Sequence, residues 1–213
     1  MAIRAYSELY LDSAMQILGH AMDFAIVTLN IAPDEFAMSF AVSDASKQFA
    51  KGNPSYVAGR SGCELARTVI EETCISTIEE EDVMYVDRSP EYWGGWALAF
   101  YQWYTAYSFM EILSTVPMSH ILKMYPVYHE MDIIKFAEEI SRRINATRTK
   151  TRLREYRDRV GVSQSQLAVN ADVPIRQIQL FEQGQRDINK TSAITLLKLS
   201  NALGCRMEDL MEM

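Results

Sequence analysis

Cysteine is scarce in this chain of 213 residues, which holds only Cys63, Cys74 and Cys205. An odd number of cysteines without a CxxC pair excludes a disulfide framework and gives no zinc-site spacing, so we expect reduced and mostly buried thiols. The first residues, MAIRAYSELYLDSAMQ, carry acidic side chains early and lack the basic-then-apolar order of a secretion signal. Both features predict a cytoplasmic protein.

Glycine and proline are also few, at 9 and 6 residues, while hydrophobic residues make up 48% of the chain. This composition excludes a disordered or fibrous chain. The alternation of apolar and polar residues that marks β-strands is rare, and apolar residues instead recur every three or four positions over long stretches. We therefore predict an all-α fold.

Catalytic and cofactor-binding motifs are absent from the sequence. His20, His120 and His129 show no metal-ligand spacing, and neither a phosphate-binding glycine loop nor a GxSxG element occurs. Adjacent acidic residues such as Glu138 and Glu139 point in different directions on a helix, which is typical of solvated faces. We expect no catalytic residue, no metal, no cofactor and no enzymatic activity.

The eighteen residues Trp93–Met110 carry no charge. The length of this stretch approaches that of a membrane span, but its glycines, its glutamine and its aromatics spread throughout differ from an aliphatic span, so we expect no membrane association. The aromatic spacing predicts a bulky core or a dimer interface, while Gly94 and Gly95 leave open a close helix neighbour or a pocket for a flat ligand. The candidate interface or pocket residues are Trp93, Trp96, Phe100, Trp103, Tyr104 and Tyr107.

Local patterns divide the first part of the chain into helices. Apolar spacing predicts helices over residues 6–30, with Leu9 in the buried stripe, and over residues 129–144, with Met131 in the stripe. Capping residues predict further helix starts, and two prolines are expected to punctuate short helices. The starts are Ser61, Ser89 and Ser108, and the prolines are Pro117 and Pro126.

Residues 145–151, NATRTKT, show no apolar periodicity and predict a linker. We place a domain boundary near residue 148, with a helical domain over residues 1–147 and a second domain over residues 148–213.

The formal net charge of −7 is unevenly distributed. Residues 1–145 hold 10 basic against 20 acidic side chains, a net −10, whereas residues 146–213 hold 11 against 8, a net +3. The acidic balance of the first part favours a basic protein partner. Basic residues concentrate just ahead of Gly161, where they suit phosphate contact or a solvated helix face. They are Arg148, Lys150, Arg152, Arg154, Arg157 and Arg159.

The segment GVSQSQLAVNADVPIRQIQLFEQGQRD, residues 161–187, predicts two short helices joined by a tight turn. Gly161 can end the preceding helix, whose stripe includes Leu153 and Val160, in a left-handed conformation. Ser163 and Gln166 predict a capping box, and Pro174 suits the first position of the following helix.

This arrangement resembles the helix-turn-helix of the lambda-repressor-like, or XRE, family of bacterial and phage regulators. The resemblance runs from about Leu153 to Met211 and takes in LREYRDRVGVSQSQLA, IQLFEQGQRDIN and TLLKLSNALGCRMEDLM. It implies a five-helix DNA-binding domain whose recognition helix, here residues 174–183, lies in the major groove of double-stranded DNA.

The resemblance also implies roles for individual residues. The base-reading positions would be Ile175, Arg176, Gln177, Gln179 and Leu180, and the phosphate contacts Gln164, Arg186, Asn189 and Lys190. Arg157 and Glu182 match a pair that ties the first helix to the end of the recognition helix, which is a structural role. The sequence departs from the common pattern because Pro174 replaces a Ser or Thr cap and because Ile175 and Leu180 are apolar, which leaves the base preference open.

Two main functions follow from this resemblance, and in both the acidic domain over residues 1–147 is expected to dimerise or to bind a partner or a ligand. The first is a sequence-specific transcriptional regulator, repressor-like, that binds an inverted repeat as a homodimer. The second is the antitoxin of a toxin–antitoxin pair, whose acidic domain binds a toxin while the helix-turn-helix domain represses its own promoter. A third hypothesis, an enzyme with an attached DNA-binding domain, has no catalytic motif to support it.

Overall fold

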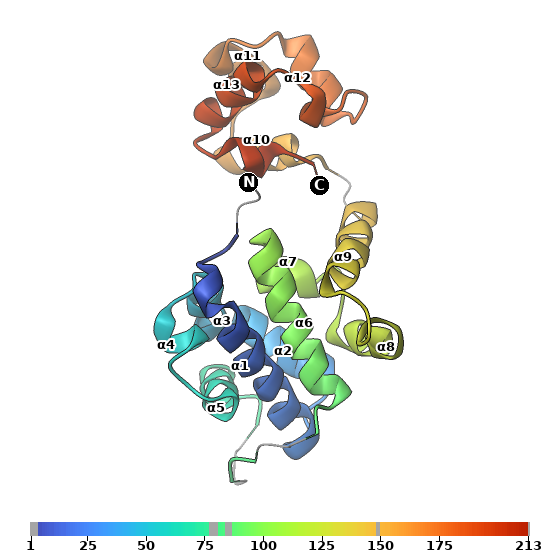
Figure 1. Cartoon of the computed structure of the whole chain (residues 1–213). Helices are drawn as coiled ribbons and strands as arrows, with labels where there is room; N and C mark the ends of the chain where they lie inside the picture. Colours follow the sequence, from blue (N-terminus) through green and yellow to red (C-terminus); the bar gives the residue numbers. More distant parts are fainter. Residues whose placement is uncertain (1–3, 77–80, 84–86, 148–149, 213) are drawn as a thin grey trace. The chain divides into compact units, whose positions relative to one another are not determined.

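The computed structural model describes residues 4–76, 81–83, 87–147 and 150–212. Every element in these ranges is helical, as predicted. The chain forms two compact units, one ending at Ile144 and one beginning at Asn145 (Figure 1). No helix among the described residues is long and apolar enough to cross a membrane.

The amino-terminal unit is built from nine α-helices among the described residues, with one 3-10 turn, η1 (Glu8–Tyr10), and one π-helical turn, η2 (Phe24–Thr28). The α-helices are α1 (Leu11–Asp23), α2 (Pro33–Val42), α3 (Asp44–Ala50), α4 (Pro54–Val57), α5 (Gly62–Thr73), α6 (Pro90–Thr105), α7 (Phe109–Leu113), α8 (Met118–Tyr128) and α9 (Ile133–Thr147). The predicted capping residues Ser61, Ser89 and Ser108 each accept a hydrogen bond from a first-turn amide of the helix that follows.

Helices α1 and α6 lie side by side at the centre of this unit (Figure 1). The approach is close because a Cβ added at Gly95 would overlap the carbonyl oxygen of Leu18. The neighbouring Gly94 instead faces the flexible ends of Met118 and Leu122. The two glycines thus admit close neighbours.

The aromatic residues of α6 and the turn after it belong to the core. Trp93, Phe100, Trp103 and Tyr107 are buried, whereas Trp96 and Tyr104 are half-buried against the same core. Trp93 packs edge-on against Tyr125 and Phe136, and Phe100 stacks on Tyr104. All three tryptophans of the chain therefore lie on one helix.

Several local predictions for this unit were wrong. Leu9 is 83% exposed because it lies in a 3-10 turn, where the α-helical spacing does not apply. Pro126 lies inside α8, near its end, and does not break the helix. Met131 precedes α9 and is half exposed. Cys74 is exposed at the left-handed end of α5.

The predicted linker overlaps a helix. Residues 145–147 continue α9, while residues 148–149 lie outside the described residues.

The described residues of the carboxy-terminal unit after α9 form four short α-helices and two 3-10 turns (Figure 1). They are α10 (Arg152–Val160), α11 (Gln164–Ala171), α12 (Ile175–Glu182), η3 (Ile188–Lys190), α13 (Ala193–Leu203) and η4 (Met207–Leu210). The fifth helix expected from the family resemblance is thus the 3-10 turn η4. Leu153, Leu167, Ile178, Leu199 and Leu210 are almost completely buried and form the small core.

The α1–α6 crossing can be tested with two adjacent glycines. Gly95→Ala should lower the free energy of unfolding by about 1–3 kcal/mol, because the added methyl group meets backbone that cannot move aside. Gly94→Ala is the matched control: its methyl group would lie 2.8 Å from the ends of two flexible side chains, and both changes gain the same helix propensity. Equilibrium urea unfolding followed by circular dichroism measures both. Equal effects of the two changes would contradict the close backbone contact.

Candidate nucleic-acid interface

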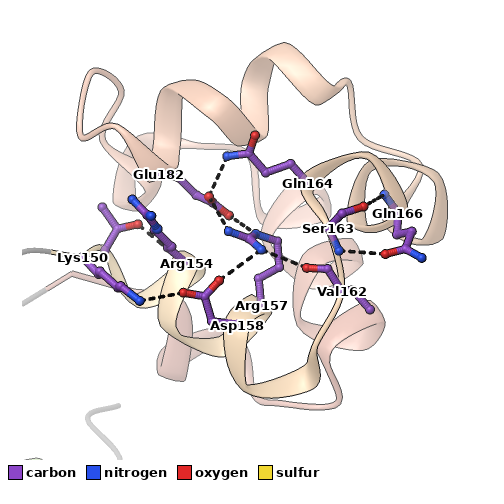
Figure 2. Close-up of polar contacts among 10 residues, drawn as sticks. Lys150, Arg154, Arg157, Asp158, Val162, Ser163, Gln164, Gln166 and Glu182 are labelled. Carbon is purple, nitrogen blue, oxygen red and sulfur yellow. Dashed lines mark hydrogen bonds and ion pairs between the residues drawn. The ribbon is translucent and has the colours of Figure 1, made fainter.

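Helix α11 begins where the sequence predicts it. Gly161 ends α10 in the left-handed region, with φ of 76°. The Ser163 amide donates to the Gln166 side chain at 2.8 Å and the Gln166 amide donates to Ser163 Oγ at 3.1 Å, which completes the capping box (Figure 2). Val160, expected in the buried stripe of α10, is instead 47% exposed.

A three-residue turn, 172–174, joins α11 to α12. Asp172 adopts a left-handed conformation, with φ of 48°, and its carboxylate accepts a hydrogen bond of 2.7 Å from Lys198 on α13. This hydrogen bond lowers the pKa of Asp172 below its ordinary value. Val173 is buried and its amide donates to the Ala168 carbonyl at 3.1 Å. The turn is thus anchored at Asp172 and at Val173.

The sequence predicts Pro174 at the first position of the helix, but Pro174 lies one residue before the helix begins. Its ψ of 131° is extended, and α12 starts at Ile175 and ends at Glu182. No side chain caps this start. The recognition helix expected over residues 174–183 is therefore shorter by one residue at each end.

The side chains of α12 separate into an inner and an outer face. Ile178, Phe181 and Glu182 are buried. Ile175 and Arg176 are exposed, and Gln177, Gln179 and Leu180 are half-buried. Gln177 reaches Thr191 Oγ1 at 3.4 Å, whereas the Arg176 side chain makes no hydrogen bond or ion pair within the described part of the chain. The outer face thus presents one unpaired guanidinium beside amide and apolar side chains.

Arg157 and Glu182 form a bidentate ion pair (Figure 2). Arg157 Nε donates to Glu182 Oε1 at 2.6 Å, and Arg157 Nη2 donates to Oε2 at 3.0 Å. Arg157 Nη1 also donates to the Val162 carbonyl at 2.9 Å. The side chains are only 12% and 2% exposed, so the pair lies in the protein rather than in water. It fixes α10, the turn after α10 and the end of α12 together.

Gln164 belongs to the same network. Its Nε2 donates to Glu182 Oε2 at 2.7 Å, so its side-chain amide is occupied within the protein (Figure 2). Residue spacing alone contains no indication of this contact, because Gln164 and Glu182 come together only when the two helices pack.

The loop after α12 carries the remaining predicted phosphate contacts. Arg186 is exposed, with its guanidinium 6.0 Å from the centre of the Phe181 ring. Lys190 has an 84% exposed side chain and a 3.5 Å ion pair with Asp187, which water largely screens. Asn189 differs from both, because its side-chain amide pairs with the backbone of Glu212. Arg186 and Lys190 are therefore the two cations that this loop presents to solvent.

The basic cluster ahead of Gly161 is less available than its sequence suggests. Arg152 is 8% exposed, Arg157 is in the buried ion pair, and Lys150 contacts Asp158 at 2.9 Å. The interaction with Lys150 lowers the pKa of Asp158. Arg154 and Arg159 are exposed, and Arg148 lies outside the described residues. Lys150 and Arg157 are thus paired within the protein, and Arg152 is buried.

No group of three or more His, Cys, Asp or Glu side chains among the described residues could hold a metal ion.

The buried ion pair predicts a specific pattern of stabilities. Arg157→Leu should destabilise the carboxy-terminal unit by about 3–5 kcal/mol, because Glu182 is left as an unpaired buried charge. The double variant Arg157→Leu with Glu182→Leu should be destabilised less than Arg157→Leu alone, since it removes both charges. Hydrogen exchange at the amides of Leu167 and Ile178 measures the stability of this unit. Additive effects would show that the two side chains act independently.

Comparison with known proteins gives one match. Residues 153–210 match a family model described as Helix-turn-helix, which covers a little over a quarter of the chain. No curated protein and no solved structure matches the chain. The matched residues begin with Leu153 in the first turn of α10 and end with Leu210 in η4, so they span every helix of the carboxy-terminal unit. Residues 153–210 are therefore similar to helix-turn-helix domains of the XRE type, the family that these residues resemble in sequence.

Proposed function

We propose that this protein is a sequence-specific transcriptional regulator of the repressor kind that inserts α12 into the major groove. The observation that carries the proposal is the division of α12 into two faces. Ile178, Phe181 and Glu182 anchor the helix, while Arg176 stands exposed and unpaired on its outer side. A helix whose inner face is packed against the domain and whose outer side chains are free suits the dimensions of the major groove.

The outer side chains of α12 match different base edges. Arg176 can donate to O6 and N7 of one guanine, which is the most common specific contact in the major groove. Gln177 and Gln179 can pair with the N6 and N7 positions of adenine, and Ile175 and Leu180 suit thymine methyl groups. Leu180 is half-buried, so its contact would be the smaller of the two apolar ones.

Phosphate contacts are assigned mainly to Arg186 and Lys190. Both are exposed in the loop after α12. Gln164 and Asn189 have their amide groups occupied within the protein, so in this structure they support the interface rather than extend from it. Phosphate contacts fix the position of the domain, while base contacts supply sequence preference.

A homodimer would place two copies of α12 in successive major grooves, about 34–36 Å apart, on an inverted repeat. The two-fold symmetry of such a dimer would be mirrored in the operator.

The charge of the amino-terminal unit favours a second candidate function, the antitoxin of a toxin–antitoxin pair. Residues 1–145 hold 20 acidic against 10 basic side chains, which suits a basic protein partner. Purification of the protein from its native host, with identification of the bound DNA and protein, distinguishes the two. A bound small basic protein whose toxicity this chain neutralises favours the antitoxin, and DNA without protein favours the regulator alone.

The recognition role of Arg176 can be tested after a binding site is selected from random duplexes. Arg176→Ala should cost about 1–3 kcal/mol on the selected site and relax the preference at one base pair, because the variant cannot form the bidentate contact with guanine. Arg159→Ala is the matched control, since it removes an exposed arginine from α10 instead. Fluorescence anisotropy with labelled duplexes measures both. The same weakening for both variants on selected and random DNA would contradict base recognition by α12.

Lys190→Ala should act differently from Arg176→Ala. It should weaken binding to all duplexes alike and reduce the slope of log K against log salt by about 0.9, because one fewer phosphate is neutralised. Titrations at several salt concentrations measure this slope. A weakening confined to the selected site would instead place Lys190 at a base edge.

A further inference from the structure

Glu212 connects two parts of the carboxy-terminal unit that are distant in the sequence. Its Oε1 accepts a hydrogen bond of 2.6 Å from the amide of Arg152, the first residue of α10. Its own amide donates to Asn189 Oδ1 at 2.9 Å, and Asn189 Nδ2 donates back to the Glu212 carbonyl. One residue thus bridges the start of α10 and the turn η3.

The loop that Glu212 contacts lies beside a hollow. We define the phosphate loop as residues 183–190, which include Arg186 and Lys190. Two of its amides, those of Gln185 and Arg186, share the Leu180 carbonyl at 3.0 and 3.1 Å, and Ile188 is its buried anchor. A hollow of about 240 Å³ lies against the loop, lined by Thr151, Leu153, Phe181, Gly184, Arg186, Asp187, Ile188 and Glu212.

We propose that Glu212 is a positioning residue that holds the phosphate loop in place for DNA binding without touching DNA itself. Glu212 lines the hollow and connects the start of α10 to Asn189, which is adjacent to Lys190. The Glu212 side chain ties the residue to the Arg152 amide, and the Glu212 backbone then restrains the loop through its two hydrogen bonds with Asn189. This inference rests on the proposed DNA-binding function and adds a residue that the interface itself does not contain.

The charge of Glu212 makes the proposal testable, because two explanations predict opposite changes in DNA affinity when the side chain is removed. Removal of an acidic side chain near a DNA-binding surface should strengthen binding if only long-range electrostatics matter. A positioning role predicts the opposite, because removal of the Glu212 side chain deletes its bond to the Arg152 amide, so the Glu212 backbone that holds Asn189 is no longer anchored to α10. Glu208 is the matched control, since it is exposed in the neighbouring turn η4 and carries the same charge.

The experiment compares Glu212→Ala, Glu212→Gln and Glu208→Ala in the full chain, with a selected duplex and a random duplex. Glu212→Ala should weaken binding to both duplexes severalfold and reduce the salt slope by about 0.9 for each phosphate that is no longer neutralised. Glu212→Gln keeps an oxygen that can accept from the Arg152 amide, so it should bind as the unaltered protein does. Glu208→Ala should bind equally well or slightly better. Equal behaviour of Glu212→Ala and Glu208→Ala, or a weaker affinity with an unchanged slope, would overturn the proposal.

A double-mutant cycle separates this role from direct DNA contact by Asn189. Asn189→Ala should weaken binding as Glu212→Ala does, and the double variant should bind no more weakly than either single variant. Additive effects would show that Asn189 contacts DNA itself and would overturn the role of Glu212.

A readout without DNA distinguishes failure of this inference from failure of the proposed function. The amides of Lys190 and Thr191 donate to carbonyls within the loop and the turn η3, so their hydrogen exchange reports whether this region is restrained. Exchange should accelerate in Glu212→Ala and not in Glu208→Ala. Absence of any DNA binding by the unaltered protein would refute the proposed function, whereas selective binding with unchanged exchange in Glu212→Ala would refute the positioning role alone.

Discussion

The carboxy-terminal unit depends on one buried interaction, the bidentate pair between Arg157 and Glu182. It joins α10 to the last residue of α12, and Gln164 adds the start of α11 to the same carboxylate. A unit with so small an apolar core gains little from packing alone, so the direction of α12 depends strongly on this charged pair. Both charges are removed from water, so loss of either partner leaves an unpaired buried charge and is costly. The attraction offsets desolvation only when the two groups keep one favourable geometry.

The core and the ion pair hold the inner face of α12. The helical period therefore determines which of its side chains lie on the outer face, toward a partner. Ile178 and Phe181 enter the core, and Glu182 enters the ion pair, so Ile175, Arg176 and Gln179 must turn outward. The same packing occupies polar groups that look available in the sequence. Gln164 and Asn189 use their amides in internal hydrogen bonds. The interface is therefore narrower than the set of polar residues around it.

Local chemistry made much of the fold predictable. Helix starts at Ser61, Ser89 and Ser108 and the left-handed end at Gly161 depend on residues within four positions of each other, and all were confirmed. Features that depend on tertiary packing were not predictable: the continuation of α8 through Pro126 and the roles of Gln164, Asn189 and Glu212. In the candidate site, residue spacing indicated which positions belong to α12. It did not indicate which neighbouring side chains would form hydrogen bonds within the protein.

The three tryptophans on α6 have a practical consequence. The carboxy-terminal unit contains only Tyr156 and Phe181 as aromatic side chains, so indole emission originates entirely in the other unit. The indole emission of this protein therefore reports on the surroundings of α6 in the amino-terminal unit, and no tryptophan in the helix-turn-helix unit contributes to it.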